Sequence, residues 1–189
     1  FLIYLKGCFC MKIEVNKMVK MAVLSAMSIV LMLLIRFPVF PSVPYYEYEP
    51  ADIPILIGAF LYGPLAAFIM TIIVAVIQFA TVSSTSSWVG IIMHTIATGA
   101  LVITAGIIYK YKKTRIGALI ALIAGTLAMT LVMIPANLYF SVKFFGMTSE
   151  EVAAMIVPII IPFNLTKAGV NSAITFIVYK HIGKILRKI

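Results

Sequence analysis

Long apolar runs separated by short polar segments make up most of this chain. The runs cover residues 18–37, 53–80, 88–109, 116–140 and about 150–180. An α-helix needs about 20 apolar residues to cross the hydrocarbon core of a bilayer. Each run meets that length, so the pattern predicts an all-α integral membrane bundle.

The second run is longer than one untilted membrane helix needs, and a Gly63-Pro64 pair interrupts it. Glycine is common just after a helix ends, and proline is common where one begins. We therefore expect one helix over residues 53–62, a tight turn, and another helix over residues 64–80, which gives six helices in all. The helix over residues 53–62 is too short to cross about 30 Å of hydrocarbon, so neighbouring helices must shield it.

Turn and capping signals separate the helices. Residues 38–50 contain four prolines, which remove backbone donors, and they predict an ordered loop rather than a helix. Asp52 follows this loop and is well placed to cap the next helix. The stretch Thr148-Ser-Glu-Glu151 has the pattern of a capping box and predicts the start of the last helix, which carries Pro158 and Pro162 in its first turns.

The composition also indicates a membrane protein. Of the 189 residues, 63% are hydrophobic and only 11% are charged, against about 25% in ordinary globular domains. Such a chain lacks the polar surface that a soluble enzyme needs. Six membrane helices also leave no room for a soluble catalytic domain.

The net charge of +9 indicates membrane orientation rather than nucleic-acid binding, because the basic residues flank the apolar runs. Twelve of the fifteen Lys and Arg residues fall on the side of the two chain ends and of the loop over residues 110–115. Five of the six acidic residues fall on the other side. Positive charge favours the cytoplasmic side, so we expect a cell-membrane protein with both termini inside.

Residues 1–10 precede Met11 and have no evident role, so we treat them as an extension and place the membrane domain in residues 11–189. Cys8 and Cys10 lie in this extension. A lone C-x-C without a neighbouring His or acidic residue is a weak metal signal. We expect neither a metal site nor a structural disulfide.

Lys167 lies inside a predicted membrane helix, where a lysine costs roughly 2.5–3.5 kcal/mol on insertion scales. Asn164 and Asn171 flank it at helical spacing, so the three side chains lie within about 60° on one helix face. This polar stripe favours an inward-facing binding site. The alternative is hydrogen bonding between helices, which polar residues often provide in membrane bundles.

Other residues suit the same site. Asn137 lies near the outer end of its helix, at the depth of Asn164, which favours one pocket open to the outside. A local role beside Pro135 explains Asn137 equally well. Glu47 and Glu49 lie in the aromatic loop, where they can receive ligand hydroxyls or pair with Arg36 or Lys167. Trp88 can stack on a flat ring or anchor the chain at the membrane surface.

The motifs that the sequence lacks exclude several activities. It has no P-loop, zinc-protease motif or nucleophile elbow, and the predicted helix interiors hold no acidic residue for proton coupling. Gln78 and His94 lie within apolar helices, but a single membrane histidine more often has a structural role. The chain is therefore suited to binding a ligand and not to energising its movement, and we expect no catalytic residues.

Two segments resemble one transporter family. Tyr48-Glu-Pro-Ala-Asp-Ile-Pro-Ile-Leu-Ile-Gly-Ala-Phe-Leu-Tyr-Gly-Pro64 is similar to the loop and second helix of the substrate-binding S components of energy-coupling factor (ECF) vitamin transporters. Pro162-Phe-Asn-Leu-Thr-Lys-Ala-Gly-Val-Asn-Ser-Ala-Ile-Thr-Phe-Ile-Val-Tyr-Lys180 is similar to the last helix of the riboflavin-specific members. The second segment is the more specific one, and the resemblance covers nearly all of residues 11–189.

The resemblance implies six helices that capture riboflavin from outside with high affinity, and no cofactor besides this transported ligand. It implies a complex with a membrane coupling subunit and two cytoplasmic ATPase subunits. Ala22-x-x-x-Ala26 matches the pattern that faces the coupling subunit in this family. Asn164 and Lys167 match polar positions of its vitamin site. Further candidate substrate contacts are Asn137, Asn171, Glu49 and Trp88.

Three alternatives remain open. The same fold serves other vitamins, such as thiamine or biotin. A small membrane enzyme would use His94 and Lys167, but the sequence offers no further catalytic group at a usable spacing. A purely structural helix-bundle subunit would need no ligand at all.

Overall fold

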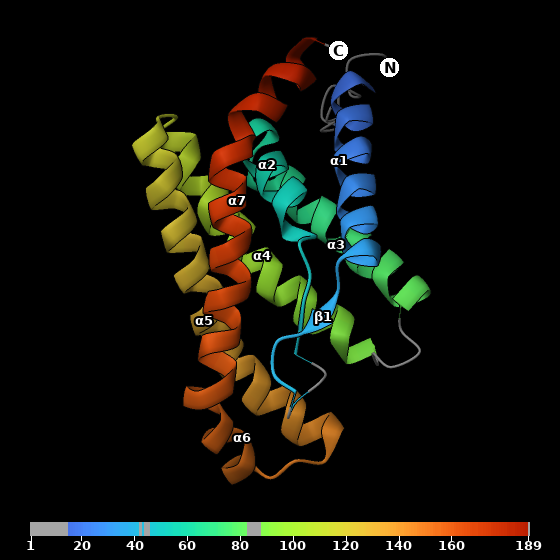
Figure 1. Ribbon diagram of the computed structural model, residues 1–189, viewed down its shortest axis with the longest axis vertical. Coiled ribbons are helices and arrows are strands. Elements are labelled where there is room, and N and C mark those ends of the chain that lie inside the picture. The colour runs from blue at the N-terminus through green and yellow to red at the C-terminus, as the bar shows by residue number, and fades with distance from the viewer. Residues whose placement is uncertain (1–14, 42, 44–45, 83–87, 189) are drawn as a thin grey trace, which may run out of the picture.

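The computed structural model describes residues 15–41, 43, 46–82 and 88–188. The predicted extension, with Cys8 and Cys10, lies outside the described residues. In chain order the elements are α1 (Val15–Leu34), β1 (Phe37–Pro38), β2 (Glu47–Tyr48), α2 (Asp52–Tyr62), α3 (Pro64–Val82), α4 (Trp88–Tyr111), α5 (Arg115–Phe145), α6 (Ser149–Met155), a π-helical turn (Ile156–Ile160) and α7 (Ile161–Lys188). The predicted helical bundle is confirmed, and the proline-rich loop adds a short β-hairpin to it (Figure 1).

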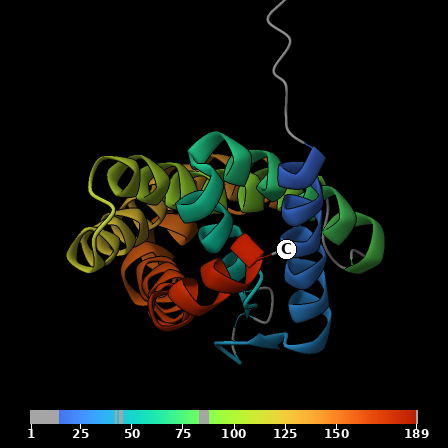
Figure 2. The same cartoon turned by 90° about the horizontal axis from the view of Figure 1, so that it is seen from above.

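The short helix α2 lies inside the bundle. It packs against α1, α3, α4 and α7, and the view along the bundle shows it between α1 on one side and α5 on the other (Figure 2). Every residue from Asp52 to Phe60 is buried. Because a helix of 11 residues cannot cross a bilayer alone, this burial provides the shielding that the sequence predicts.

The chain breaks between α2 and α3 at the predicted position. Gly63 has a φ of +94°, which favours glycine because a Cβ would be strained there, and Pro64 begins α3. Gly106 of α4 packs against this turn. A Cβ on Gly106 would lie 3.0 Å from both Cα and Cβ of Pro64. Glycine at this position therefore allows α3 and α4 to approach closely.

α6, the π-helical turn and α7 follow one another from Ser149 to Lys188 as one helical stretch. The predicted capping box is present: Oγ1 of Thr148 accepts from the Glu151 amide, and the Glu151 carboxylate accepts from the Thr148 amide. Pro158 lies in the π-helical turn. Proline has no N–H to donate, so the wider turn falls where a regular α-helix would lose a hydrogen bond.

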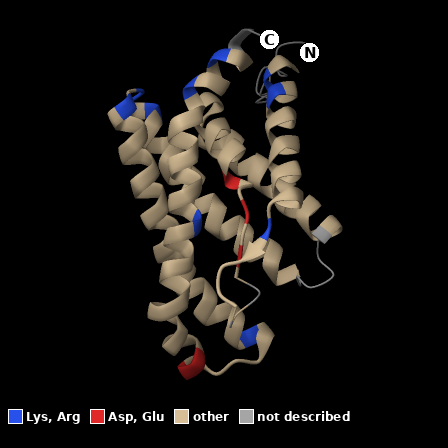
Figure 3. Cartoon of the chain, viewed as in Figure 1, with Lys and Arg blue, Asp and Glu red and all other residues tan. Residues whose placement is uncertain are grey.

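Among the described residues, five helical segments are long and apolar enough to cross a membrane: α1, α3, α4, α5 and the stretch from α6 to α7. Lys and Arg gather at the end of the molecule where α1 begins and α7 ends (Figure 3). The acidic residues of the described ranges lie in the middle of the molecule and toward the opposite end. The charge separation that the sequence predicts along the chain is thus also a separation in space.

Candidate functional site

The β1–β2 hairpin brings the segment between α1 and α2 back against the bundle. Its strands pair in antiparallel register, with Phe37 opposite Tyr48. Arg36 follows α1 and forms an ion pair with Glu47 of β2. These contacts hold β1 and β2 together, and Glu49, the residue after β2, lies in the interior.

Two tyrosines of this segment bond to asparagines on separate helices. The Tyr46 hydroxyl donates to Oδ1 of Asn137 on α5, and the Tyr48 hydroxyl donates to Oδ1 of Asn171 on α7, each at 2.9 Å. Nδ2 of Asn171 donates to the backbone carbonyl of Glu49 at 3.1 Å. The backbone around Glu49 is therefore fixed to two helices, and this attachment positions its carboxylate.

Three donors surround the Glu49 carboxylate, which is only 3% exposed. Nζ of Lys167 lies 3.0 Å from Oε1, and Nε2 of Gln78 donates to Oε2 at 3.0 Å. Nδ1 of His94 lies 3.4 Å from Oε1. Burial alone would raise the pKa of Glu49, but the Lys167 ammonium and the His94 contact outweigh burial and hold this pKa below its usual range. Glu49 is thus an ionised acceptor that joins α3, α4 and α7.

The prediction that Asp52 caps α2 is wrong. Asp52 is the first residue of that helix, and among the described residues no side-chain cap bond forms at its N-terminus. Its buried carboxylate accepts from Oγ1 of Thr98 at 2.7 Å and from Nδ2 of Asn171 at 3.0 Å. A buried carboxylate requires bonded partners, so the donors on α4 and α7 determine where Asp52 points.

A cavity of about 550 Å³ opens beside Glu49, between the hairpin and helices α3, α4, α5 and α7. Methionine and phenylalanine side chains form much of its apolar wall, among them Met93, Met129, Met133 and Phe163.

The charged groups of this cavity neutralise one another. Its two cations, Arg36 and Lys167, pair with its two carboxylates, Glu47 and Glu49. His94 also lines the cavity, and its Nε2 is buried with no hydrogen-bond partner among the described residues. The cavity therefore suits an uncharged ligand that offers both an apolar face and hydrogen-bonding groups.

The structure brings four of the six predicted contact residues to the cavity wall: Glu49, Asn137, Asn164 and Lys167. Asn171 is not among the lining residues. Its side chain bonds to the Tyr48 hydroxyl and to the Glu49 carbonyl, so it holds the hairpin in place without facing the cavity. Trp88 does not line the cavity either. It is 48% exposed and packs edge-on against Phe144.

The two lining asparagines also bond within their own helices. Nδ2 of Asn137 donates to the Met133 carbonyl, and Nδ2 of Asn164 donates to the Ile160 carbonyl, each at 2.8 Å. The local bond considered for Asn137 is therefore present, and the residue faces the cavity as well. Ile160 is the last residue of the π-helical turn, so Asn164 bonds across the junction with α7.

Several residues that line the cavity are not predicted from the sequence as part of the site. A structural role is the expectation for His94, and the sequence assigns none to Gln78; both contact Glu49 in the cavity wall. Met133 and Met129 precede Asn137 on α5 by four and eight residues, and they share its helix face. That spacing is a signal in the sequence which could have found them.

Ala22 and Ala26 lie on α1, away from the cavity, and both are exposed. Their neighbours Val19, Val23 and Val30 are also about half exposed. Within the part of the chain that the structure describes, this face of α1 packs against no other helix.

Comparisons with known proteins agree with one another. Residues 16–179 match the family described as ECF transporter, substrate-specific component. The chain is 28% identical over 180 residues to the riboflavin transporter RibU of Staphylococcus aureus, a match that covers 92% of this chain and 94% of that protein. It is 29% identical over 176 residues to the riboflavin transporter FmnP of Bacillus subtilis, covering 88% and 91% of the two. The solved S component of a bacterial ECF transporter superposes with a TM-score of 0.78 at 27% identity, covering 92% of this chain and 98% of that one.

Proposed function

Since this chain belongs to the family of ECF transporter substrate-specific components, we propose that it captures riboflavin (vitamin B2) and delivers it for ATP-driven uptake. Two relatives that match most of the chain carry the name riboflavin transporter. Membership of this family supports a role as a component of a membrane transporter rather than as an enzyme.

The charge-balanced cavity beside Glu49 is the observation that carries this proposal. Riboflavin is uncharged, and it combines a flat ring system, which bears carbonyl and N–H groups, with a tail of hydroxyls. The apolar wall suits the ring, and the buried amides and the Lys167–Glu49 pair offer donors and acceptors to the polar groups. A volume of about 550 Å³ lies within the roughly 300–1,000 Å³ of small-molecule sites.

The proposal gives different roles to the predicted residues. Lys167 has three N–H donors and uses one on Glu49, so it keeps donors for ligand oxygens. Asn171 positions the hairpin, and Trp88 packs against Phe144, the residue before the lining residue Phe145, rather than contacting the ligand. The residues assigned to direct contact are Glu49, Asn137, Asn164 and Lys167.

The charge distribution supports a location in the cell membrane with both termini inside. Basic residues gather at one end of the molecule, which holds the start of α1, the α4–α5 turn and the end of α7. Positive charge favours the cytoplasmic side, so this end belongs there. The cavity beside Glu49 lies toward the other end of the bundle, so in this orientation it receives its ligand from outside.

Delivery in this proposal requires a membrane coupling subunit and two cytoplasmic ATPases. The chain itself has no P-loop, so the energy must come from partner subunits. Ala22 and Ala26 support a docking role for α1 because two exposed small residues four positions apart allow another helix to approach closely.

Titration of the purified full chain with a panel of vitamins tests the proposal. We expect saturable binding of one riboflavin per chain, measured by quenching of flavin fluorescence, and no competition from thiamine or biotin. Protein from a flavin-containing host should be yellow. A chain that binds thiamine or biotin but not riboflavin would contradict the choice of vitamin, and a chain that binds none of them would contradict the site.

A further inference from the structure

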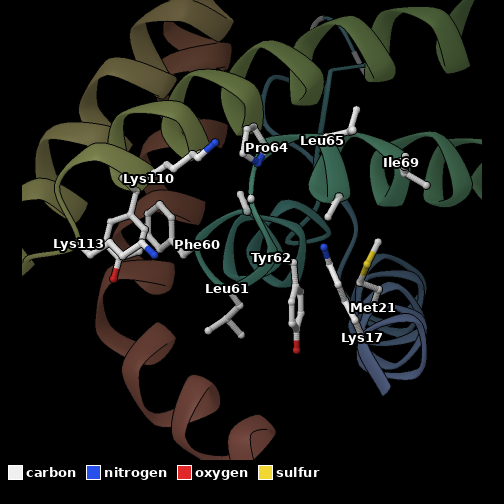
Figure 4. A pocket seen from close by; sticks show the side chains of 15 residues that line it. Lys17, Met21, Phe60, Leu61, Tyr62, Pro64, Leu65, Ile69, Lys110 and Lys113 are labelled. Atoms are coloured by element: carbon white, nitrogen blue, oxygen red, sulfur yellow. The ribbon is translucent and has the colours of Figure 1, made fainter. Parts of the chain in front are cut away.

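A separate cavity lies around the α2–α3 turn, at the end of the molecule where the basic residues gather. Its volume is about 450 Å³, and the proposed function does not use it. Its walls come from α1, α2, α3 and the end of α4. Figure 4 shows Lys17 of α1 and Lys110 of α4 extending toward the turn at Pro64 from different sides.

Three lysines line this cavity: Lys17, Lys110 and Lys113. The ion pairs in the described ranges involve Glu47 or Glu49, and none reaches these lysines. Unpaired cations around a hollow with low-dielectric walls concentrate a positive potential there. The cavity therefore favours an anion, in contrast to the charge-balanced cavity beside Glu49.

The remainder of the cavity is apolar, and it continues onto the outside of α3. Leu65 and Ile69 form one lip of the cavity and are 60% and 37% exposed. Ile72 and Val76 follow on the same helix face and are 41% and 53% exposed. These four residues form an apolar track of about 16 Å along α3. The track begins at Leu65, which lines the same cavity as the lysines.

We propose that this cavity binds an anionic phospholipid, with the headgroup phosphate among Lys17, Lys110 and Lys113 and one acyl chain along the α3 track. A small soluble phosphate compound would satisfy the lysines but would make no contact with the adjoining apolar track. A phospholipid satisfies both, because its charge and its hydrocarbon are joined in one molecule. With both termini inside, the cavity faces the cytoplasmic leaflet, which is rich in anionic lipids; this placement rests on the orientation proposed above.

Lipid titration of the purified full chain tests this site. Dioleoyl phosphatidylglycerol is added to delipidated protein in a neutral detergent, and the first bound lipid is counted by native mass spectrometry. The test variant carries Lys17→Gln, Lys110→Gln and Lys113→Gln. We expect it to bind the first lipid roughly tenfold or more weakly than the unmodified chain, since a lysine beside an anionic lipid surface contributes about a fivefold factor.

A matched control separates the cavity from general surface charge. It carries Lys20→Gln, Lys112→Gln and Lys180→Gln, which remove the same charge from α1, the α4–α5 turn and α7 at residues that do not line the cavity. Because these three lysines do not line the cavity, this control should lose clearly less affinity for the first bound lipid than the cavity variant does. Equal weakening in both triple variants would overturn the proposal. Thermal unfolding of each variant establishes that it is folded.

Other ligands distinguish the sources of the anion. Dioleoyl phosphatidylcholine, which has no net charge, should bind without dependence on the three cavity lysines. If inorganic phosphate or glycerol phosphate binds with the same lysine dependence and displaces the lipid, the site takes a soluble phosphate and the lipid assignment is overturned. If the cavity variant keeps its lipid affinity but loses co-purification with the coupling subunit, the site is a protein contact instead. No flavin enters these measurements, so their failure leaves the riboflavin proposal untouched.

Discussion

The two cavities are similar in volume, about 550 and 450 Å³, but they differ in how their charges are arranged. Beside Glu49, each charged side chain has an opposite charge as its neighbour. Around the α2–α3 turn, no carboxylate from the described ranges pairs with the three lysines. A cavity that is already neutral favours an uncharged ligand, whereas a cavity with unpaired cations favours an anion.

Burial explains the difference. Lys167 and Glu49 are 7% and 3% exposed, so neither charge can rely on water and each requires a partner in the protein. Lys110 and Lys113 are exposed, and water solvates them until a ligand arrives. The depth of a charge in this bundle therefore determines whether the protein itself has to neutralise it.

Replacement of Lys167 by Met breaks the neutrality of the cavity beside Glu49 and should have the largest effect. It leaves a buried carboxylate without its cation, so the free energy of unfolding should fall by about 3–5 kcal/mol. Riboflavin binding should be lost with it. Chemical unfolding of the purified variant and a flavin titration measure the two effects.

Two controls accompany this prediction. Lys110→Met removes an exposed lysine with no described carboxylate partner, and it should change the unfolding free energy by less than about 0.5 kcal/mol. The double variant Lys167→Met/Glu49→Gln removes both charges, so it should regain stability without regaining riboflavin affinity. If Lys167→Met alone is as stable as the unmodified chain, burial does not enforce the pairing described above.

Replacement of Asn164 by Ala tests whether amides, rather than charges, recognise the ligand in the neutral cavity. Loss of one buried hydrogen-bonding partner should weaken riboflavin binding by about 1–3 kcal/mol, measured by titration. Ser172→Ala is the matched control on α7, because Ser172 bonds to Thr126 and does not line the cavity. Equal losses of affinity in the two variants would show a general effect on α7 and not a contact with the ligand.

Replacement of Ala22 by Leu tests whether ligand binding and partner docking are separate. Ala22 is exposed on α1, so a larger side chain should weaken assembly with the coupling subunit by about 1–2 kcal/mol while riboflavin affinity stays unchanged. Co-purification and titration measure the two properties. Val23→Leu, at an exposed neighbour on α1, should leave assembly intact; if it disrupts assembly to the same extent, the small residues are not the contact.

Replacement of Arg36 by Gln should have the smallest effect of the series. Arg36 pairs with Glu47 at the edge of the neutral cavity, and both side chains are partly exposed. Water can solvate the remaining Glu47 carboxylate, so riboflavin affinity and stability should each change by less than about 1 kcal/mol. A loss as large as that of Lys167→Met would contradict the conclusion that burial, and not pairing as such, sets the energy.

The sequence predicts the helices well because their signals are local. The apolar runs, the Gly63-Pro64 break and the Thr148 capping box each lie within a few residues, and each is confirmed. The shielding of α2 follows from its length alone. The stripe on α7 is also a local pattern, and two of its three residues, Asn164 and Lys167, line one cavity.

The partners of the carboxylates are not predictable in the same way. Glu49 could pair with several residues, and its position depends on a hairpin that hydroxyl groups fix to Asn137 and Asn171. Asp52 has the sequence context of a helix cap, yet donors from α4 and α7 hold it instead. The partners of both carboxylates depend on which helices, distant in sequence, pack together. The local spacing of residues in the chain does not predict that packing.

The distance along the chain between Glu49 and Lys167 also constrains how the protein is made. Lys167 follows Glu49 by 118 residues, so the ribosome has produced most of the chain before this carboxylate meets its cation. An unpaired carboxylate is costly away from water, so we expect the hairpin to stay at the aqueous surface while the earlier helices insert. We therefore expect closure of the hairpin to be a late step of biogenesis, because a nascent chain that stops short of α7 lacks Lys167 and the α7 wall of the cavity.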